Sequence, residues 1–168
     1  MNAKVEKLLN RQIKAEAQSS HIYLAMASWA ENHGIGGTAA FMYRHAEEER
    51  MHMLKLVRFV NERGGKALIP AVDVPKTDYK SVRELFSQLL EHEIKVTDMI
   101  NEVVYTCQAE RDFTTNNFMQ WYVAEQLEEE ALARNILDKL KMIGDDKGGL
   151  YLFDRDLENM PATEPAPQ

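Results

Sequence analysis

Glutamates and one histidine recur in this sequence at spacings that could hold metal ions. Glu49 and His52 are three residues apart, so on a helix they lie one turn apart on one face and can both ligate a single cation. Glu16, Glu93 and Glu129 interrupt stripes that are otherwise largely apolar. Oxygen ligands with one imidazole and no thiolate suit iron or manganese better than a structural zinc site. These residue types therefore favour a site for iron or manganese.

Long helices must position these residues, because helix-breaking residues are confined to a few places. The eight glycines fall at 34, 36, 37, 64, 65, 144, 148 and 149, and the five prolines at 70, 75, 161, 165 and 167. Glycine costs about 1 kcal/mol and proline about 3 kcal/mol inside a helix, so long helices are expected within 1–33, 38–63 and 76–143. The last segment is expected to break at the polar stretch 110–117, whose side chains compete for backbone hydrogen bonds. Four long helices result.

Two signals mark helix ends. Ser81 and Glu84 are spaced as a capping box that opens the third helix, and Gly144 lies where the fourth helix needs a left-handed end. A short fifth helix is expected at about 147–157. We predict one domain over residues 1–160, followed by a flexible C-terminal tail over 161–168.

Each of the four long helices carries acid in its inward stripe. On the third, positions 82, 86, 89, 93, 96, 100 and 103 read Val, Phe, Leu, Glu, Val, Ile and Val, the spacing of a helix buried along one face. An ionised carboxylate left unpaired there costs several kcal/mol, and none of the stripes offers a lysine or arginine. Metal ions would resolve this cost.

Connection lengths set the expected topology. Short links make the first and second helices, and the third and fourth, antiparallel hairpins. The link at about 64–80 can reach roughly 50 Å when extended, enough to run back along a whole helix, so the second and third helices are expected to be parallel. The alternative, a flexible linker between two domains, is disfavoured because two helices could hardly bury their own faces.

Composition excludes several classes of protein. With 168 residues, 45% hydrophobic and 28% charged, the chain reads as one globular unit, and its net charge of -7 argues against nucleic-acid and anionic-membrane partners. Cys107 is the single cysteine, so no internal disulfide can form. Neither a signal core nor a run of about 18 apolar residues occurs, and we predict a cytoplasmic protein.

Plainer interpretations stay open for these residues. The runs 47–50 and 128–130 could be solvated charge, and His45 is interpreted as a satisfied core histidine. The histidines at 21, 33 and 92 are expected at the surface. A metal-free helical scaffold with protonated inward glutamates is physically possible, because burial raises the pKa of a glutamate.

Taken together, the pattern resembles that of the non-haem bacterial ferritins. The resemblance rests on Glu16 with Tyr23, the run 48–52, Glu93 and the run 124–129, and it extends through Asn159. The resemblance implies an all-α, ferritin-like four-helix bundle with a long second-to-third crossover and a short fifth helix. It also implies a 24-subunit homo-oligomeric cage whose subunits act as ferroxidases, oxidising Fe(II) with oxygen or peroxide and storing ferric mineral. A di-iron peroxidase or oxygenase without storage is the alternative.

The resemblance also implies roles for individual residues. The first iron would be held by Glu16, Glu49 and His52; the second, with Glu49 bridging, by Glu49, Glu93 and Glu129. A third site would use Glu48, Glu125, Glu128 and Glu129, and Tyr23 and Gln126 would act beside the irons or on the oxygen side. Haem is not expected, because Arg50 follows Glu49 where haem-binding relatives have methionine. The start of the fourth helix at 114–117 lacks the acidic pair that lines the iron-entry channels of animal ferritins.

Overall fold

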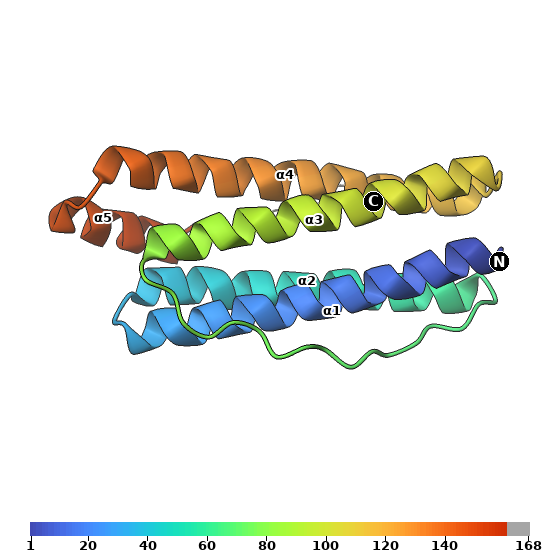
Figure 1. Ribbon diagram of the computed structural model, residues 1–168, viewed down its shortest axis with the longest axis horizontal. Helices are drawn as coiled ribbons and strands as arrows, with labels where there is room; N and C mark the ends of the chain where they lie inside the picture. Colours follow the sequence, from blue (N-terminus) through green and yellow to red (C-terminus); the bar gives the residue numbers. More distant parts are fainter. Residues whose placement is uncertain (161–168) are drawn as a thin grey trace.

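The computed structural model describes residues 1–160, which form five helices and confirm the all-α prediction. They are α1 (Ala3–Asn32), α2 (Gly36–Glu62), α3 (Val82–Ala109), α4 (Phe113–Ile143) and α5 (Lys147–Glu158). The first four lie along one another as a long bundle, and α5 is a short helix at one end (Figure 1). The tail predicted over 161–168 lies outside the described residues.

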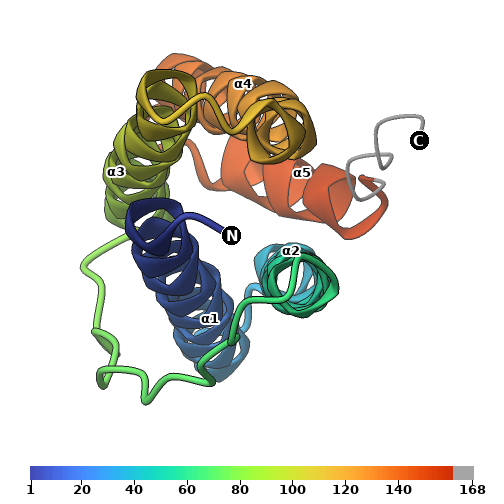
Figure 2. The same cartoon turned by 90° about the vertical axis from the view of Figure 1, so that its right-hand side faces the viewer.

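The crossover between α2 and α3 runs back along the outside of α1, so α2 and α3 are parallel as predicted (Figures 1 and 2). Two amide side chains of α1 attach it. Asn10 donates to the carbonyl of Lys66 at 3.0 Å and accepts from the amide of Leu68 at 2.7 Å. Gln18 bonds both backbone groups of Asp73 in the same way, at 3.0 and 2.7 Å. These side chains satisfy backbone groups that have no strand partner.

The predicted helix ends are present with one variation. Ser81 Oγ accepts from the Glu84 amide at 3.1 Å, whereas the Glu84 carboxylate accepts from Lys80 at 2.7 Å, one residue before the position of a standard capping box. Gly144 ends α4 with φ 61°, which a residue with a Cβ rarely adopts. Asp112 caps α4 by accepting from the Thr115 amide at 3.0 Å, so the break predicted over 110–117 is only a tight turn.

The start of α2 differs from the prediction, because Gly36 and Gly37 lie inside the helix rather than before it. The reason is a long-range cap from α5. The Asp154 carboxylate accepts from the amides of Gly37 at 3.0 Å and Thr38 at 2.7 Å, and from the Thr38 hydroxyl at 2.8 Å. A Cβ on residue 37 would lie 1.7 Å from the Asp154 carbonyl oxygen, so glycine is required at this approach.

The core consists of two apolar clusters with a polar layer between them. One cluster, near α5, includes Met26, Phe86 and Leu140, and the other includes Leu9 and Ile100 near the opposite end. The acidic positions of every long helix fall between these clusters along the chain. Two apolar clusters therefore stabilise the bundle on both sides of a layer that could not stabilise itself.

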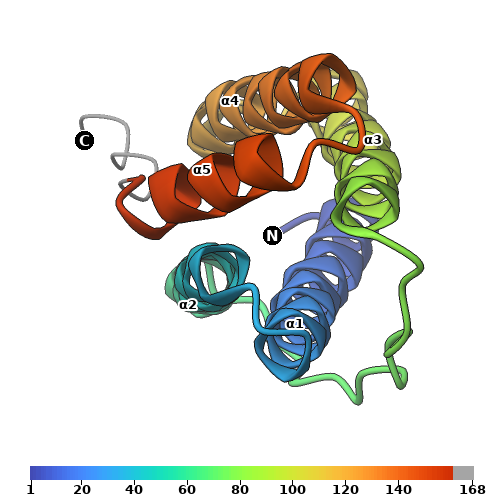
Figure 3. The same ribbon diagram turned by 90° about the vertical axis from the view of Figure 1, so that its left-hand side faces the viewer.

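The bundle is not equally tight on all sides. α1 packs along α2, α3 along α4, and α1 against α3, whereas within residues 1–160 no Cα of α2 comes within 8 Å of one in α4. At one end α5 lies between these two helices (Figure 3). None of the described helices is long and apolar enough to span a membrane.

Candidate metal centre

The polar layer contains five glutamates that are no more than 3% exposed. They are Glu16, Glu49, Glu93, Glu125 and Glu129. In the described part of the chain, no lysine or arginine forms an ion pair with Glu16, Glu49, Glu93 or Glu129. Buried carboxylates normally have a cation or a metal as a partner, so these four carboxylates lack a positively charged partner.

Glu16, Glu49 and His52 converge as one group. Their ligand atoms all lie within 4.8 Å of one another, and His52 Nδ1 is 3.6 Å from Glu49 Oε2. Gln12 Nε2 donates to Glu16 Oε1 at 2.8 Å, which orients this carboxylate. Burial, and then the charge of Glu49, raise the pKa of Glu16 well above its ordinary value. Two carboxylates and an imidazole placed in this way can coordinate one divalent cation.

Glu93 lies beside this group and is held by two donors. Tyr23 Oη donates to Glu93 Oε1 at 2.9 Å, and Gln126 Nε2 donates to Glu93 Oε2 at 3.1 Å. Burial raises the pKa of Glu93 to about 7, while the hydrogen bonds from Gln126 and Tyr23 oppose that rise. Tyr23 and Gln126 therefore orient Glu93 and favour its charged form.

A second converging group contains a residue whose role the sequence interpretation missed. Ligand atoms of His45, Glu48 and Glu129 also lie within 4.8 Å of one another. His45 is buried as predicted, and its Nδ1 bonds the Phe41 carbonyl at 2.9 Å, which gives Nδ1 the proton and leaves a lone pair on Nε2. Within residues 1–160 that Nε2 and Glu129 Oε1 have no hydrogen-bond partner.

His45 is therefore only half satisfied, which corrects the prediction of a satisfied core histidine. Burial lowers its pKa to about 4, so the imidazole is neutral, the form that ligates metals. Burial, and then the charge of Glu93, raise the pKa of Glu129 well above its ordinary value. The available signal was the position of His45 one turn before Glu49 on the inward stripe of α2.

The remaining candidates divide between core and surface. Glu125 is buried, whereas Glu128 is exposed. His21 and His33 are exposed as predicted, whereas His92 is half-buried, and its Nε2 lies 2.7 Å from Oγ of the buried Ser19.

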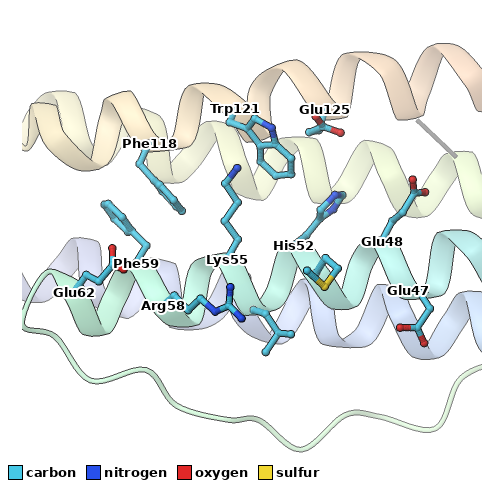
Figure 4. A pocket seen from close by; sticks show the side chains of 12 residues that line it. Glu47, Glu48, His52, Lys55, Arg58, Phe59, Glu62, Phe118, Trp121 and Glu125 are labelled. Carbon is cyan, nitrogen blue, oxygen red and sulfur yellow. The ribbon is translucent and has the colours of Figure 1, made fainter. Parts of the chain in front are cut away.

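A groove of about 650 Å³ connects the layer with the outside between α2 and α4 (Figure 4). Phe59 and Phe118 stack in it with ring centroids 3.7 Å apart, and Lys55 Nζ lies 3.5 Å from the ring centroid of Trp121. His52 borders the groove and keeps 11% of its side chain exposed. The centre is therefore buried on most sides and reachable along this groove.

Comparisons with known proteins find relatives over most of the chain. A model of the family described as "Ferritin-like domain" matches residues 6–143. A probable bacterial non-heme ferritin-like protein of Haemophilus influenzae is 46% identical over 95% of this chain and 97% of its own length. A bacterial non-heme ferritin of Campylobacter jejuni is 41% identical over 95% and 96%. The solved open pore ferritin of the hyperthermophilic archaeon Archaeoglobus fulgidus has a TM-score of 0.94 and 43% identity, covering 96% of this chain and 99% of its own.

Proposed function

Because this chain belongs to the ferritin family, we propose that it is an iron-storage ferritin that takes Fe(II) as its substrate and oxidises it within each subunit. The observation that carries the proposal is that four buried glutamates, Glu16, Glu49, Glu93 and Glu129, form no ion pair with a lysine or arginine of the described residues. Three of them belong to the two groups whose ligand atoms converge within 4.8 Å. Iron ions would supply the missing positive charge.

The first iron is assigned to Glu16, Glu49 and His52, and the second to Glu49, Glu93 and Glu129, with Glu49 bridging. Convergence of the first three residues supports the first position. The position of Glu93, held by Tyr23 and Gln126, supports the second. Two-metal sites place their ions about 3.5–4 Å apart, a separation that one bridging carboxylate can span.

The redox step balances with two irons and one oxidant molecule. Each Fe(II) loses one electron, and the pair of electrons with two protons reduces dioxygen to hydrogen peroxide, or peroxide to two waters. Transfer of electrons in pairs avoids the release of superoxide. The carboxylates would hold the ferric product through oxygen atoms that can change position, so the product could leave toward the hollow interior of the cage.

A third iron site would lie next to these two. We assign it to Glu48, Glu125, Glu128 and Glu129, and we add His45 because its ring nitrogen lies within 4.8 Å of ligand atoms of Glu48 and Glu129. Glu128 is exposed, which suits a site on the way out. Storage of mineral then requires a closed shell, and we propose the 24-subunit cage that the resemblance implies, without bound haem.

The test is anaerobic addition of Fe(II) to the apo-protein followed by air, with absorbance and particle mass recorded together. Fast oxidation in a large shell that retains many more ions than the sites could hold supports the proposal. Iron binding in a small oligomer would indicate a di-iron oxidase or peroxidase instead, and no binding would leave the metal-free scaffold.

Two substitutions locate the reaction. Glu93→Ala or His52→Ala should preserve the helical circular dichroism and slow iron oxidation greatly. Glu91→Ala is the matched control, because Glu91 is exposed on the same helix two residues before Glu93. Oxidation at the wild-type rate in both Glu93→Ala and His52→Ala would reject this centre.

A further inference from the structure

A chain of hydrogen bonds leaves the metal centre between α3 and α4 and ends at the surface. Besides Glu93, the side-chain nitrogen of Gln126 contacts Thr97 Oγ1 at 3.3 Å. Thr97 Oγ1 donates to Glu130 Oε1 at 2.6 Å, and Arg134 pairs with the other carboxylate oxygen of Glu130. The Arg134 side chain is 52% exposed, so these hydrogen bonds connect the ion pair of Arg134 with Glu130 at the surface to the buried carboxylate of Glu93.

The directions of these bonds follow from the number of protons available. Arg134 forms an ion pair with one oxygen of Glu130 and the Thr97 hydroxyl lies 2.6 Å from the other, so the Glu130 carboxylate can only accept. Thr97 has one hydroxyl proton and gives it to Glu130, which leaves only lone pairs toward Gln126. Gln126 must therefore turn its NH₂ group to Thr97.

The same NH₂ group donates to the carboxylate and to the backbone carbonyl of Glu93, both at 3.1 Å. If the Gln126 amide were turned over, its carbonyl oxygen would face the Thr97 lone pairs and both of these Glu93 oxygens, three repulsive contacts in a buried site. We propose that Thr97, held by the Glu130–Arg134 pair, is a positioning residue that fixes the orientation of the Gln126 amide and so aims Glu93 at the second iron. The inference rests on the second iron position proposed above.

A purely structural role for Thr97 makes a different prediction. Valine has nearly the shape of threonine without the hydroxyl, so packing alone would tolerate Thr97→Val. Serine keeps the hydroxyl and loses a methyl group, so packing alone would be disturbed more by Thr97→Ser. The two substitutions therefore separate orientation of the Gln126 amide from packing.

The experiment titrates the assembled apo-protein with Co(II) and follows its visible absorption, which reports the ligand geometry of each ion bound. In Thr97→Val we expect the second Co(II) to bind about tenfold more weakly, the first to bind as in the wild type, and the spectrum of the second to change. Thr97→Ser keeps the hydroxyl, so its affinity for the second Co(II) and the spectrum of that ion should be those of the wild type. Thr106→Val, a half-buried threonine on the same helix, is the matched control and should bind both ions normally.

Arg134→Gln tests the outer end of the chain without touching the interior, and it should weaken the second Co(II) in the same direction by about two- to threefold. Wild-type binding of the second ion in Thr97→Val, or equal loss in Thr97→Val and Thr97→Ser, would overturn the positioning role while leaving the metal centre intact. A wild-type protein that binds only one Co(II) would instead overturn the proposed second iron position, and this inference with it.

Discussion

Glu93 contributes to the pH dependence of the stability of the metal-free protein, and Glu93→Gln should remove that contribution. The carboxyl is 1% exposed and its pKa is raised to about 7, chiefly by burial, from an ordinary value of 4.5. Between these two values the folded protein holds a proton on Glu93 that the unfolded chain releases. The contribution of Glu93 to the free energy of unfolding is therefore greatest below pH 4.5 and is lost as the pH rises through 7.

The size of the effect follows from the displacement of the pKa. About 2.5 pKa units at roughly 1.4 kcal/mol each give about 3.5 kcal/mol in all, of which about 2 to 3 kcal/mol falls between roughly pH 5 and pH 8. Glutamine has nearly the same shape and does not titrate. Its NH₂ group would face one of the donors that now serve Glu93, a cost of about 1–3 kcal/mol that does not vary with pH.

The assay is urea unfolding of the apo-forms of both proteins at a series of pH values, with chelator present and the assembly state checked by light scattering. The wild type minus Glu93→Gln difference in unfolding free energy should fall by about 2 to 3 kcal/mol from roughly pH 5 to pH 8. Parallel curves for the two proteins would refute the reasoning, because they would show that Glu93 is not protonated in the folded state near neutral pH.

The other predictions concern the cap from α5, metal binding and the tyrosine. Gly37→Ala should lower the free energy of unfolding by about 2–4 kcal/mol in chemical denaturation, since its Cβ would collide with the Asp154 carbonyl. Gly36→Ala is the control and should be nearly neutral, because a Cβ at residue 36 has nothing within 4 Å. Equal effects of the two substitutions would exclude the collision as the cause. Zn(II) at 100 times its dissociation constant should stabilise the apo-protein by about 3 kcal/mol. The measurement is a rise in the midpoint of thermal unfolding that a chelator reverses. An unchanged midpoint in the wild type would contradict metal binding. Tyr23→Phe should keep the fold and slow the oxidation of Fe(II), because Glu93 loses the hydrogen bond that the Tyr23 hydroxyl donates. Stopped-flow absorbance measures the rate. A wild-type rate would assign Tyr23 to packing alone.

The bundle and its acidic layer follow from the sequence because both depend on helical periodicity. Residues three and four apart share a face whatever the rest of the chain does, so an acid such as Glu93 among apolar stripe positions is predictably buried. The length of the crossover likewise leaves few topologies. These features are local in sequence, or they depend on distance along the chain alone.

The hydrogen-bond partners are not predictable in this way. Asp154 caps α2 from 116 residues beyond Thr38, and no local signal marks it, so the predicted start of α2 came two residues late. His45 was predicted as buried, but which of its ring nitrogens meets the Phe41 carbonyl depends on the rotamer. Spacing therefore fixes which residues face inward and leaves open which atoms meet.

The missing positive charge is the feature that separates a binding centre from a structural ion pair. A buried lysine beside Glu49 or Glu129 would neutralise these carboxylates permanently, and an iron ion would then have to displace it. Burial, and then the charge of Glu93, instead raise the pKa of both carboxyls well above the ordinary range, which favours their protonated forms. In the function proposed above, such a proton would leave when a divalent cation arrives, so the centre would fill and empty without breaking the packing of the apolar clusters on either side. The stability lost to burying carboxylates would thus be the physical condition for the proposed site, which must release its product.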